Sequence, residues 1–369
     1  MSVEILDCSQ KTATALEGAD ADQCPLTQAE VLGESDLPAW DHFVSSHPQA
    51  SVYHLSVWRH IVARACGKPW YVVGVIEDGR VRGGIPFVHM KSALFGNFLV
   101  SMPYVNYGGL LVEHESLVQP ILDESVRLAQ RVAARHIELR HLQDYCPTWP
   151  SRTEKVSMWL DLPPTSEALF QRFKPKLRSQ IRKGEKNGLH VREGGIELLD
   201  DFYAVFAQNM RDLGTPVYNK LFFQLILEAF PKSARLMVVT DAHSLPIAGG
   251  FLLGFRNRLE IPWASSLRQY NRLQSNMWLY WHCLRYGCEQ GYEIFDFGRS
   301  TVGSSTFKFK KQWGAVPVKH YWHYWLEGSH KLPRLNPDNP KFRLAITLWR
   351  HLPVSVTRLV GPAIARHLP

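Results

Sequence analysis

The sequence of 369 residues lacks the usual signs of a secreted or membrane-spanning chain. Residues 1–10 have neither the basic nor the apolar region of a signal peptide. No apolar run reaches the roughly 20 residues needed to cross a bilayer. The six cysteines form no Cys-x-x-Cys pair and are too sparse for a disulfide framework. We therefore expect a cytoplasmic protein with reduced thiols.

The common catalytic motifs are also missing. There is no Gly-x-Ser-x-Gly elbow and no phosphate-binding P-loop, which argues against serine hydrolases and nucleotide triphosphatases. Sixteen histidines are present, His320 and His323 among them, but none has the spacing of a zinc motif. We expect no metal and no bound cofactor.

Acidic residues are unevenly distributed, although the chain has a formal net charge of only +8. Residues 1–50 contain nine acidic residues and one lysine, whereas residues 172–192 contain eight basic residues and one glutamate. Residues 299–320 hold five Lys or Arg and no acid, and residues 331–369 hold seven basic residues and one aspartate. Local basic blocks therefore indicate an anionic partner more strongly than the overall charge does.

The sequence contains an internal repeat. Residues 71–87 align without gaps on residues 237–253, so that Val72-Val73 falls on Val238-Val239 and Gly83-Gly84 on Gly249-Gly250. Both segments predict a strand, a polar turn and a second strand that opens with the glycine pair. Each is preceded by a helical pattern and followed by a helix that leads into an apolar strand. We expect an α/β fold with mixed sheets, built from one unit used twice.

A basic helix is predicted between the two copies, in residues 166–191. Pro175 suits its first turn and Gly188 its end, while Leu177 and Ile181 face inward. Arg178, Arg182 and Lys186 then form one cationic stripe, because they are spaced four residues apart. The stripe is either a solvated face or an anion site, and we favour binding of phosphate.

A second basic region, residues 295–315, follows the last predicted core strand. Asp296 is expected at the end of that strand. The alternation Phe307-Lys308-Phe309-Lys310 predicts a further strand with the two lysines on one face. Such a strand is either an edge protected by lysines or part of a binding site.

Together, the repeat, the segment LRSQIRKGEKNG and the later FDFGR…FKFKKQWGA resemble the Fem-type (FemAB, FemABX) aminoacyltransferase family. More narrowly, the sequence resembles the FemAB-like subgroup that accompanies PEP-CTERM/exosortase systems of exopolysaccharide-producing bacteria. The resemblance extends from about residue 35 to the end. The family's basic motif is matched by Arg178, Ile181, Arg182, Lys183, Lys186 and Gly188, with Gly184 in place of the usual alanine. Its Phe-Lys pair is matched by Phe309-Lys310.

The resemblance implies two tandem acetyltransferase-like (GNAT) domains that join an aminoacyl group to an amine of a peptidoglycan precursor. No helical tRNA-binding arm is readable, so the donor is aminoacyl-tRNA, acyl-CoA or an acyl carrier protein. The expected organisation is an acidic segment (1–34), a first domain (35–165), the basic helix (166–192), a second domain with the active site (193–330) and a basic C-terminal segment (331–369).

The transfer chemistry suggests roles for the matched residues. Lys310 is the expected cation for the negative charge that develops on the carbonyl oxygen. The stripe with Lys183 would anchor a phosphate-bearing acceptor. Asp296 would orient the amine or accept its proton, or else pair with Arg299. Tyr218 contacts substrate or packs in the core. Further candidate substrate-binding residues are Arg299, Lys308 and Phe309.

The C-terminal segment leaves two interpretations open. It either packs on the second domain or lies on anionic lipid at the inner face of the membrane, where a lipid-linked envelope precursor would be the acceptor. Three functions follow from the sequence. They are Fem-like transfer in envelope or exopolysaccharide biogenesis, transfer from acyl-CoA or an acyl carrier protein, and non-catalytic binding of nucleic acid or anionic membrane.

Overall fold

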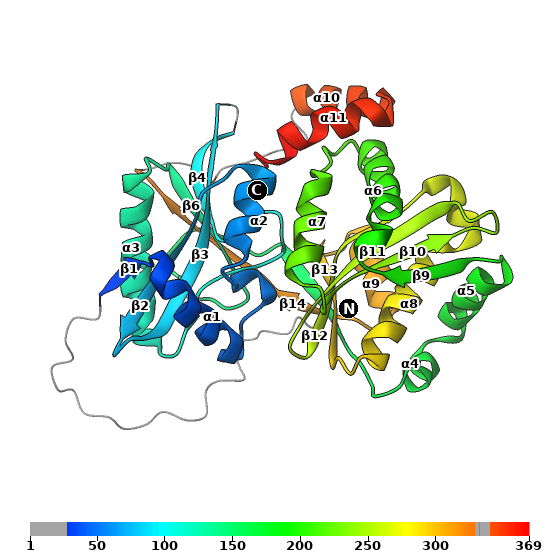
Figure 1. The fold of residues 1–369 in the computed structure, drawn as a ribbon, viewed down its shortest axis with the longest axis horizontal. Coiled ribbons are helices and arrows are strands. Elements are labelled where there is room, and N and C mark those ends of the chain that lie inside the picture. Colours follow the sequence, from blue (N-terminus) through cyan, green and yellow to red (C-terminus); the bar gives the residue numbers. More distant parts are fainter. Residues whose placement is uncertain (1–27, 94, 329–331, 333–339, 369) are drawn as a thin grey trace. The chain divides into compact units, whose positions relative to one another are not determined.

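The computed structural model describes residues 28–93, 95–328, 332 and 340–368. The chain divides into two units, one of residues 1–157, 317–333 and 367–369, and the other of residues 158–316 and 334–366. Each unit is a mixed sheet with helices packed on it, as Figure 1 shows. The fold is therefore mixed α/β, as expected.

The first unit contains an eight-stranded sheet, in which β5 pairs with β3 beside the path β1-β2-β3-β4-β6-β15-β7. Its elements are β1 (Ala29–Val31), α1 (Leu37–Ser46), α2 (Trp58–Cys66), β2 (Trp70–Glu77), β3 (Arg80–Ser92), β4 (Gly96–Val100), β5 (Leu111–Val112), α3 (Val118–Arg131), β6 (His136–His141), β7 (Ser151–Arg152) and β15 (Tyr321–Leu326).

The second unit contains a seven-stranded sheet in the order β14-β8-β13-β12-β11-β10-β9, of which the start of β8 and the end of β14 fall in residue ranges of the first unit. Its elements are β8 (Lys155–Asp161), α4 (Ser166–Arg172), α5 (Pro175–Lys186), β9 (His190–Gly194), α6 (Leu199–Leu213), α7 (Lys220–Ala229), β10 (Ala234–Thr240), β11 (Pro246–Phe255), β12 (Arg258–Ser266), α8 (Ser275–Glu289), β13 (Ile294–Thr301), α9 (Ser305–Gln312), β14 (Val316–Lys319), α10 (Pro340–His351) and α11 (Val354–Ala365).

The duplication is visible in the strand pairing. In the first sheet β1-β2-β3-β4 are antiparallel neighbours and β4 pairs with β6 in parallel. In the second sheet β9-β10-β11-β12 are antiparallel neighbours and β12 pairs with β13 in parallel. Order and direction are the same, so the two units are tandem copies of one topology.

The glycine pairs show where the ungapped alignment is wrong. A Cβ on Gly84 would lie 2.8 Å from Trp40 in α1, and one on Gly249 would lie 3.1 Å from Phe202 in α6. Their neighbours Gly83 and Gly250 face the other side of each sheet, toward α3 and α8. Because α1 and α6 are the equivalent helices, the aligned glycines point to opposite faces, and the true register differs by one residue.

The expected domain boundaries also differ from the two units. Residues 317–330 were assigned to the second domain, but Tyr321–Leu326 (β15) pairs antiparallel with His136–His141 (β6) in the first sheet. Residues 158–165, assigned to the first domain, belong to the second unit. Each copy thus completes its sheet with strands that lie outside its own repeat. The acidic segment 1–34 lies largely outside the described residues.

Candidate active site

The candidate site lies where β12 and β13 stop pairing. In the described chain their parallel pairing covers the pairs Arg258–Ile294, Leu259–Phe295 and Glu260–Asp296. Beyond these pairs β12 runs on to Ser266 and β13 to Thr301. Edges of neighbouring strands that do not pair with each other can bind an extended, amide-containing ligand through the backbone.

Lys310 is buried beside this point. Its side chain is only 7% exposed, and Nζ donates hydrogen bonds of 2.9 Å to the carbonyl oxygens of Gly298 and Arg299. Burial lowers the pKa of Lys310 to about 8, and the negative charges of Asp296 and Glu260 oppose that shift. The lysine is therefore mostly protonated at pH 7, although it lies in the protein interior.

Asp296 holds the bend of β13 whose carbonyls bind Lys310. It is fully buried, and its two carboxylate oxygens accept hydrogen bonds from the Trp159 indole N–H (2.8 Å) and the Gly298 backbone N–H (2.7 Å). Burial raises the pKa of Asp296, and the positive charge of Arg258 is the largest influence against that rise. Asp296 lies within β13 and does not end it, so the expected position at the strand end was wrong.

Gly298 forms the bend in β13 between Asp296 and the carbonyls that bind Lys310. Its φ of +73° is in the left-handed region, which glycine adopts without strain. That turn brings the Gly298 N–H back to Asp296, while the Gly298 carbonyl faces Lys310. The sequence Phe-Asp-Phe-Gly therefore encodes a bend inside a buried strand, and this bend places the carboxylate and the ammonium together.

The predicted strand over residues 307–310 was wrong, because these residues form helix α9. Ser304 caps the helix, since its side chain accepts a hydrogen bond from the Phe307 N–H. On a helix, Phe307 and Lys310 share a face, and both are buried. Lys308 is on the exposed side, so the two lysines do not share a face as expected.

The basic stripe has the form that the sequence predicted. Leu177 and Ile181 are buried, and α5 packs on α8 (Figure 1). Gly188 ends the segment with a φ of +67°. The exposed side of the helix lines an open cavity of about 470 Å³, whose described lining residues are Pro175, Arg178, Ser179, Arg182, Lys183 and Lys186. Four cationic side chains of α5 therefore line one open cavity.

Helix packing explains why residue 184 is glycine. A Cβ at this position would lie 2.9 Å from the Cβ of Trp278 on α8, closer than real contacts of this kind. The Trp278 Cβ is at the root of its side chain and cannot turn away. The departure from the family's alanine thus allows α5 to pack closely on α8 at Trp278.

The remaining predicted residues are dispersed around the second unit. Phe309 packs against Tyr280, with ring centroids 5.0 Å apart. Arg299 lies near the end of β13, and its carbonyl binds Lys310. Tyr218 is half-buried and packs against Phe222 and Phe223 of α7, so its role as a substrate contact stays a prediction.

Sequence reasoning missed two residues of this charge network. Glu260 is 4% exposed and lies opposite Asp296 in the parallel ladder. Arg258 lies over the Trp159 ring at 4.5 Å. A glutamate within the apolar strand LEIPW was the available signal, because a carboxylate at an inward position needs a partner.

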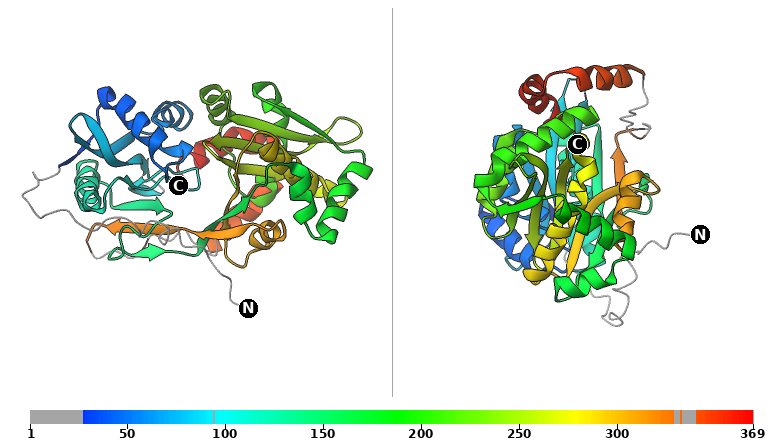
Figure 2. Two further views of the ribbon diagram at one scale, coloured as in Figure 1. Left: turned by 90° about the horizontal axis from the view of Figure 1, so that it is seen from below. Right: turned by 90° about the vertical axis from the view of Figure 1, so that its right-hand side faces the viewer.

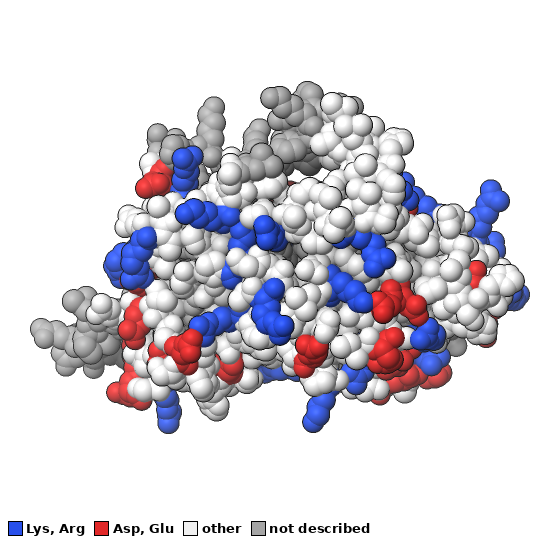
Figure 3. All heavy atoms as spheres, turned by 45° about the horizontal axis from the view of Figure 1, so that its top comes forward, with Lys and Arg blue, Asp and Glu red and all other residues white. Residues whose placement is uncertain are grey.

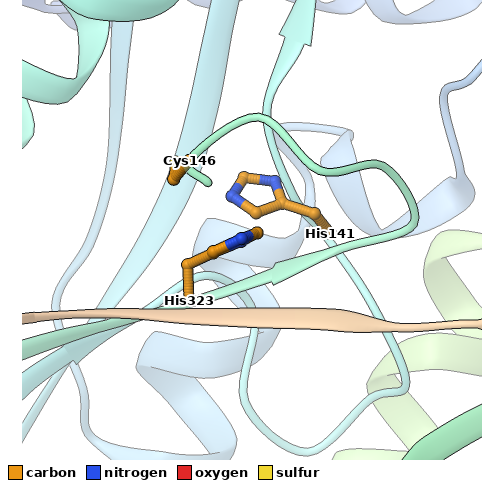
Figure 4. A group of neighbouring side chains, drawn as sticks. All are labelled: His141, Cys146 and His323. Carbon is orange, nitrogen blue, oxygen red and sulfur yellow. The ribbon is translucent and has the colours of Figure 1, made fainter. Parts of the chain in front are cut away.

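A second buried polar cluster occurs in the first unit (Figure 4). Potential ligand atoms of His141, Cys146 and His323 lie within 4.8 Å of one another. Burial raises the pKa of Cys146 to about 12 and lowers the pKa of His141 well below its ordinary value, so both are neutral at pH 7. No sequence spacing pointed to this cluster, since His323 reaches it through the pairing of β15 with β6.

One hydrogen bond of this cluster, that of His141, counts against a metal-ligand set. The Leu110 backbone N–H donates to His141 Nδ1 at 3.1 Å, so the neutral ring carries its proton on Nε2. His323 Nε2 lies 2.9 Å from a carboxylate oxygen of Asp144. A metal bound at His141 Nε2 would have to displace that proton, and the Leu110 contact would then be lost. Among the described residues, His141 Nε2 and His323 Nδ1 have no hydrogen-bond partner.

Residues 171–311 match the family described as the acetyltransferase (GNAT) domain. With the repeated topology, this match defines the fold as two tandem GNAT-like domains. The matched residues include the basic helix, the β12/β13 ladder and Lys310. No curated protein matches the sequence.

Solved structures with this fold are distant in sequence. FemX superposes with a TM-score of 0.60 at 14% identity, over 80% of this chain and 96% of FemX. L-PGS from Bacillus licheniformis gives 0.52 at 14% identity, over 90% and 98%. A tandem GNAT protein from the clavulanic acid biosynthesis pathway gives 0.50 at 11%, over 82% and 99%. The chain thus has a GNAT-like acyltransferase fold.

Proposed function

We propose that the protein is an N-acyl or aminoacyl transferase that joins an activated acyl group to an amine of a cell-envelope or exopolysaccharide precursor. The observation that carries the proposal is the buried ammonium of Lys310 beside the last pair of the β12/β13 ladder. It lies within the region that matches the GNAT domain.

The reaction needs a positive group at a defined place. The amine nitrogen attacks the acyl carbon, a C–N bond forms, and the bond from that carbon to the donor's sulfur or oxygen breaks. The donor leaves as a thiol or hydroxyl with the proton that the amine loses. Negative charge builds on the carbonyl oxygen in between, and a preorganised donor for it is worth about 10²–10³ in rate.

Lys310 suits this task. An ammonium has three N–H donors. Two of them are held by the carbonyls of Gly298 and Arg299, which fixes the nitrogen in place and leaves one donor for the substrate. Asp296 is a positioning residue in this scheme, because both of its oxygens already accept hydrogen bonds.

The cavity along α5 would bind the phosphate of a precursor or donor. Arg178, Arg182, Lys183 and Lys186 line it, and no acidic residue is among its described lining. Guanidinium groups bind phosphate oxygens through two hydrogen bonds at once. These contacts exist before and during the reaction, so they hold the substrate rather than accelerate the chemical step.

The test below also distinguishes two alternative functions. Transfer from acyl-CoA or an acyl carrier protein keeps the same chemistry, and its phosphate-bearing carrier also suits the basic cavity. Non-catalytic binding of nucleic acid would use the cavity without turnover and would weaken steeply with salt.

In the test, the purified protein is incubated with each class of donor and with amine-bearing precursors. Mixed aminoacyl-tRNA, acetyl-CoA, long-chain acyl-CoA and acyl carrier protein would be incubated separately with a precursor extract, and products would be analysed by mass spectrometry. The proposal expects one donor class to add its acyl mass to an amine. Salt-sensitive RNA binding with no product from any donor would contradict it.

A further inference from the structure

The C-terminal helices α10 and α11 carry a large part of the exposed apolar surface. Large hydrophobic side chains that are well exposed include Leu344 (63%), Leu348 (61%), Val356 (39%), Leu359 (81%) and Val360 (41%). These five are half of the ten such side chains in the described chain. Contiguous exposed apolar surface of this kind marks an interaction site.

The exposed residues form one stripe on each helix. Leu344 and Leu348 are four residues apart on α10, and Val356, Leu359 and Val360 share a side of α11. The helices follow one another through Leu352 and Pro353, and both lie against α6 (Figure 2). Both helices therefore pack on the same helix of the second unit.

Contacts on the opposite side hold the pair in this orientation. Thr357 and Ala365 are each 1% exposed, and a Cβ on Gly361 would lie 3.0 Å from the Val217 backbone. Arg211 on α6 donates a hydrogen bond of 3.0 Å to the Leu352 carbonyl between the helices. The buried side of the two helices is thus packed on the rest of the second unit. The leucines lie on the opposite, solvent-exposed side.

The charge around the stripes has one sign. Residues 340–369 contain no Asp or Glu, and Arg350, Arg358 and Arg366 are exposed. Arg350 also donates a hydrogen bond to the Leu213 carbonyl, and Arg358 lies 5.3 Å from the Tyr203 ring, so these two arginines are at the edge of the stripes next to α6. In Figure 3 uncharged spheres dominate the area of α10 and α11, whereas acidic and basic spheres are interspersed over the lower surface. Apolar helix faces flanked by arginine are typical of helices that lie in the interface of an anionic bilayer.

We propose that α10 and α11 dock this protein on an anionic lipid surface, with both helices in the plane of the interface. Leu344, Leu348 and Leu359 enter the acyl region, and the arginines bind lipid phosphates. A protein partner would not explain why the charged residues around the stripes are all basic. The helices lie on the bilayer, because no described helix is long and apolar enough to cross it. The proposal does not depend on the acyltransferase activity.

The experiment is vesicle co-sedimentation of the full-length protein. Vesicles of phosphatidylcholine alone would be compared with vesicles that contain one quarter phosphatidylglycerol, at 0.1 and 0.5 M salt. Each cation near an anionic surface contributes about fivefold in affinity. Three arginines therefore predict about a hundredfold tighter binding to the anionic vesicles at low salt, and most of this gain should disappear at high salt.

A matched pair of variants tests the leucines. Leu348→Glu/Leu359→Glu changes two exposed positions of the stripes, and Ile196→Glu/Leu245→Glu makes the same chemical change at positions 51% and 47% exposed elsewhere in the unit. The first variant should bind anionic vesicles at least about tenfold more weakly than the control variant does, because it also loses the apolar burial of two leucines. The control should lose no more than its added negative charge explains, about fivefold per residue at most.

Three results would overturn the proposal. Equal binding to both vesicle types would remove the role of the charge. Equal loss in the two variants would remove the role of the stripes. Failure to bind vesicles, together with a dimer that Leu348→Glu/Leu359→Glu dissociates in light scattering, would assign the surface to a second copy of the chain.

Discussion

Replacing Lys310 by methionine should change how the stability of the protein depends on pH. Lys310 has a pKa of about 8 in the folded protein, below its ordinary value of 10.5. Between these two values the unfolded chain binds more protons than the folded chain, so the free energy of unfolding rises with pH in this window. Methionine does not titrate, and the variant should lack this rise.

The difference in pKa corresponds to roughly 3 kcal/mol over the whole window. Lys310 is 7% exposed, so solvent screening reduces this value little. Near pH 10 the variant should be the less stable protein, because the carbonyls of Gly298 and Arg299 lose their donor at about 1–3 kcal/mol each. Toward pH 7 the gap between parent and variant should narrow by about 3 kcal/mol.

Urea unfolding followed by circular dichroism at pH 7, 8, 9 and 10 measures this gap. Tyrosines and cysteines also titrate in the window, but they are common to both proteins and cancel in the difference. Lys308→Met is the matched control, since Lys308 is exposed on the same helix, and its gap should stay constant. A constant gap for Lys310→Met would refute the buried, proton-losing lysine on which the proposed site rests.

Three further predictions concern the same unit. Gly184→Ala should lower the free energy of unfolding by about 1 kcal/mol in urea titration, because overpacking against Trp278 exceeds the gain in helix propensity; a more stable variant would contradict this. The rate constant kcat should fall as pH rises through about 8, since the Lys310 ammonium is lost there, whereas a rise would indicate that neutral Lys310 acts as a base. Arg182→Glu should raise the acceptor KM more than it lowers kcat in steady-state assays, because Arg182 lines the basic cavity, and a selective loss of kcat would count against anchoring.

Local patterns carried most of what the sequence could predict. The helix Pro175–Lys186, its buried Leu177 and Ile181 and its cationic side all follow from residues at most a few turns apart. The repeat was also visible, because strands and glycines follow in the same order in both copies. The alignment could not show the one-residue register difference, since loop lengths between strands are free to vary.

Helix α9 shows the limit of a short alternating pattern. Four residues, Phe307 to Lys310, fit a strand by alternation, but they also put Phe307 and Lys310 on one helix face. The decisive signal was the cap at Ser304, one residue after Gly303 with its φ of +80°. A capping residue outweighs four alternating positions, because it satisfies the first N–H groups of a helix.

The sequence could not predict the pairing of strands that are far apart in the chain. The pairing of β15 with β6 joins residues about 180 positions apart, and the sequence of neither strand indicates which strand it pairs with. The approach of Asp296 and Lys310 could be expected from their nearness in sequence, but Glu260 joins them only through the parallel ladder. The C-terminal segment forms two helices that pack on α6, as one of its two interpretations expected. Its exposed leucines leave the other interpretation, contact with anionic lipid, as a prediction.

Mass spectrometry of envelope glycans and precursors from cells with and without this protein tests the central claim most directly. The account predicts that an amine-bearing precursor lacks one acyl or aminoacyl mass when the protein is absent, and that the purified protein with the matching donor restores it. Identical precursor masses in both cell types, with no transfer by the purified protein, would contradict the assignment as an N-acyl or aminoacyl transferase.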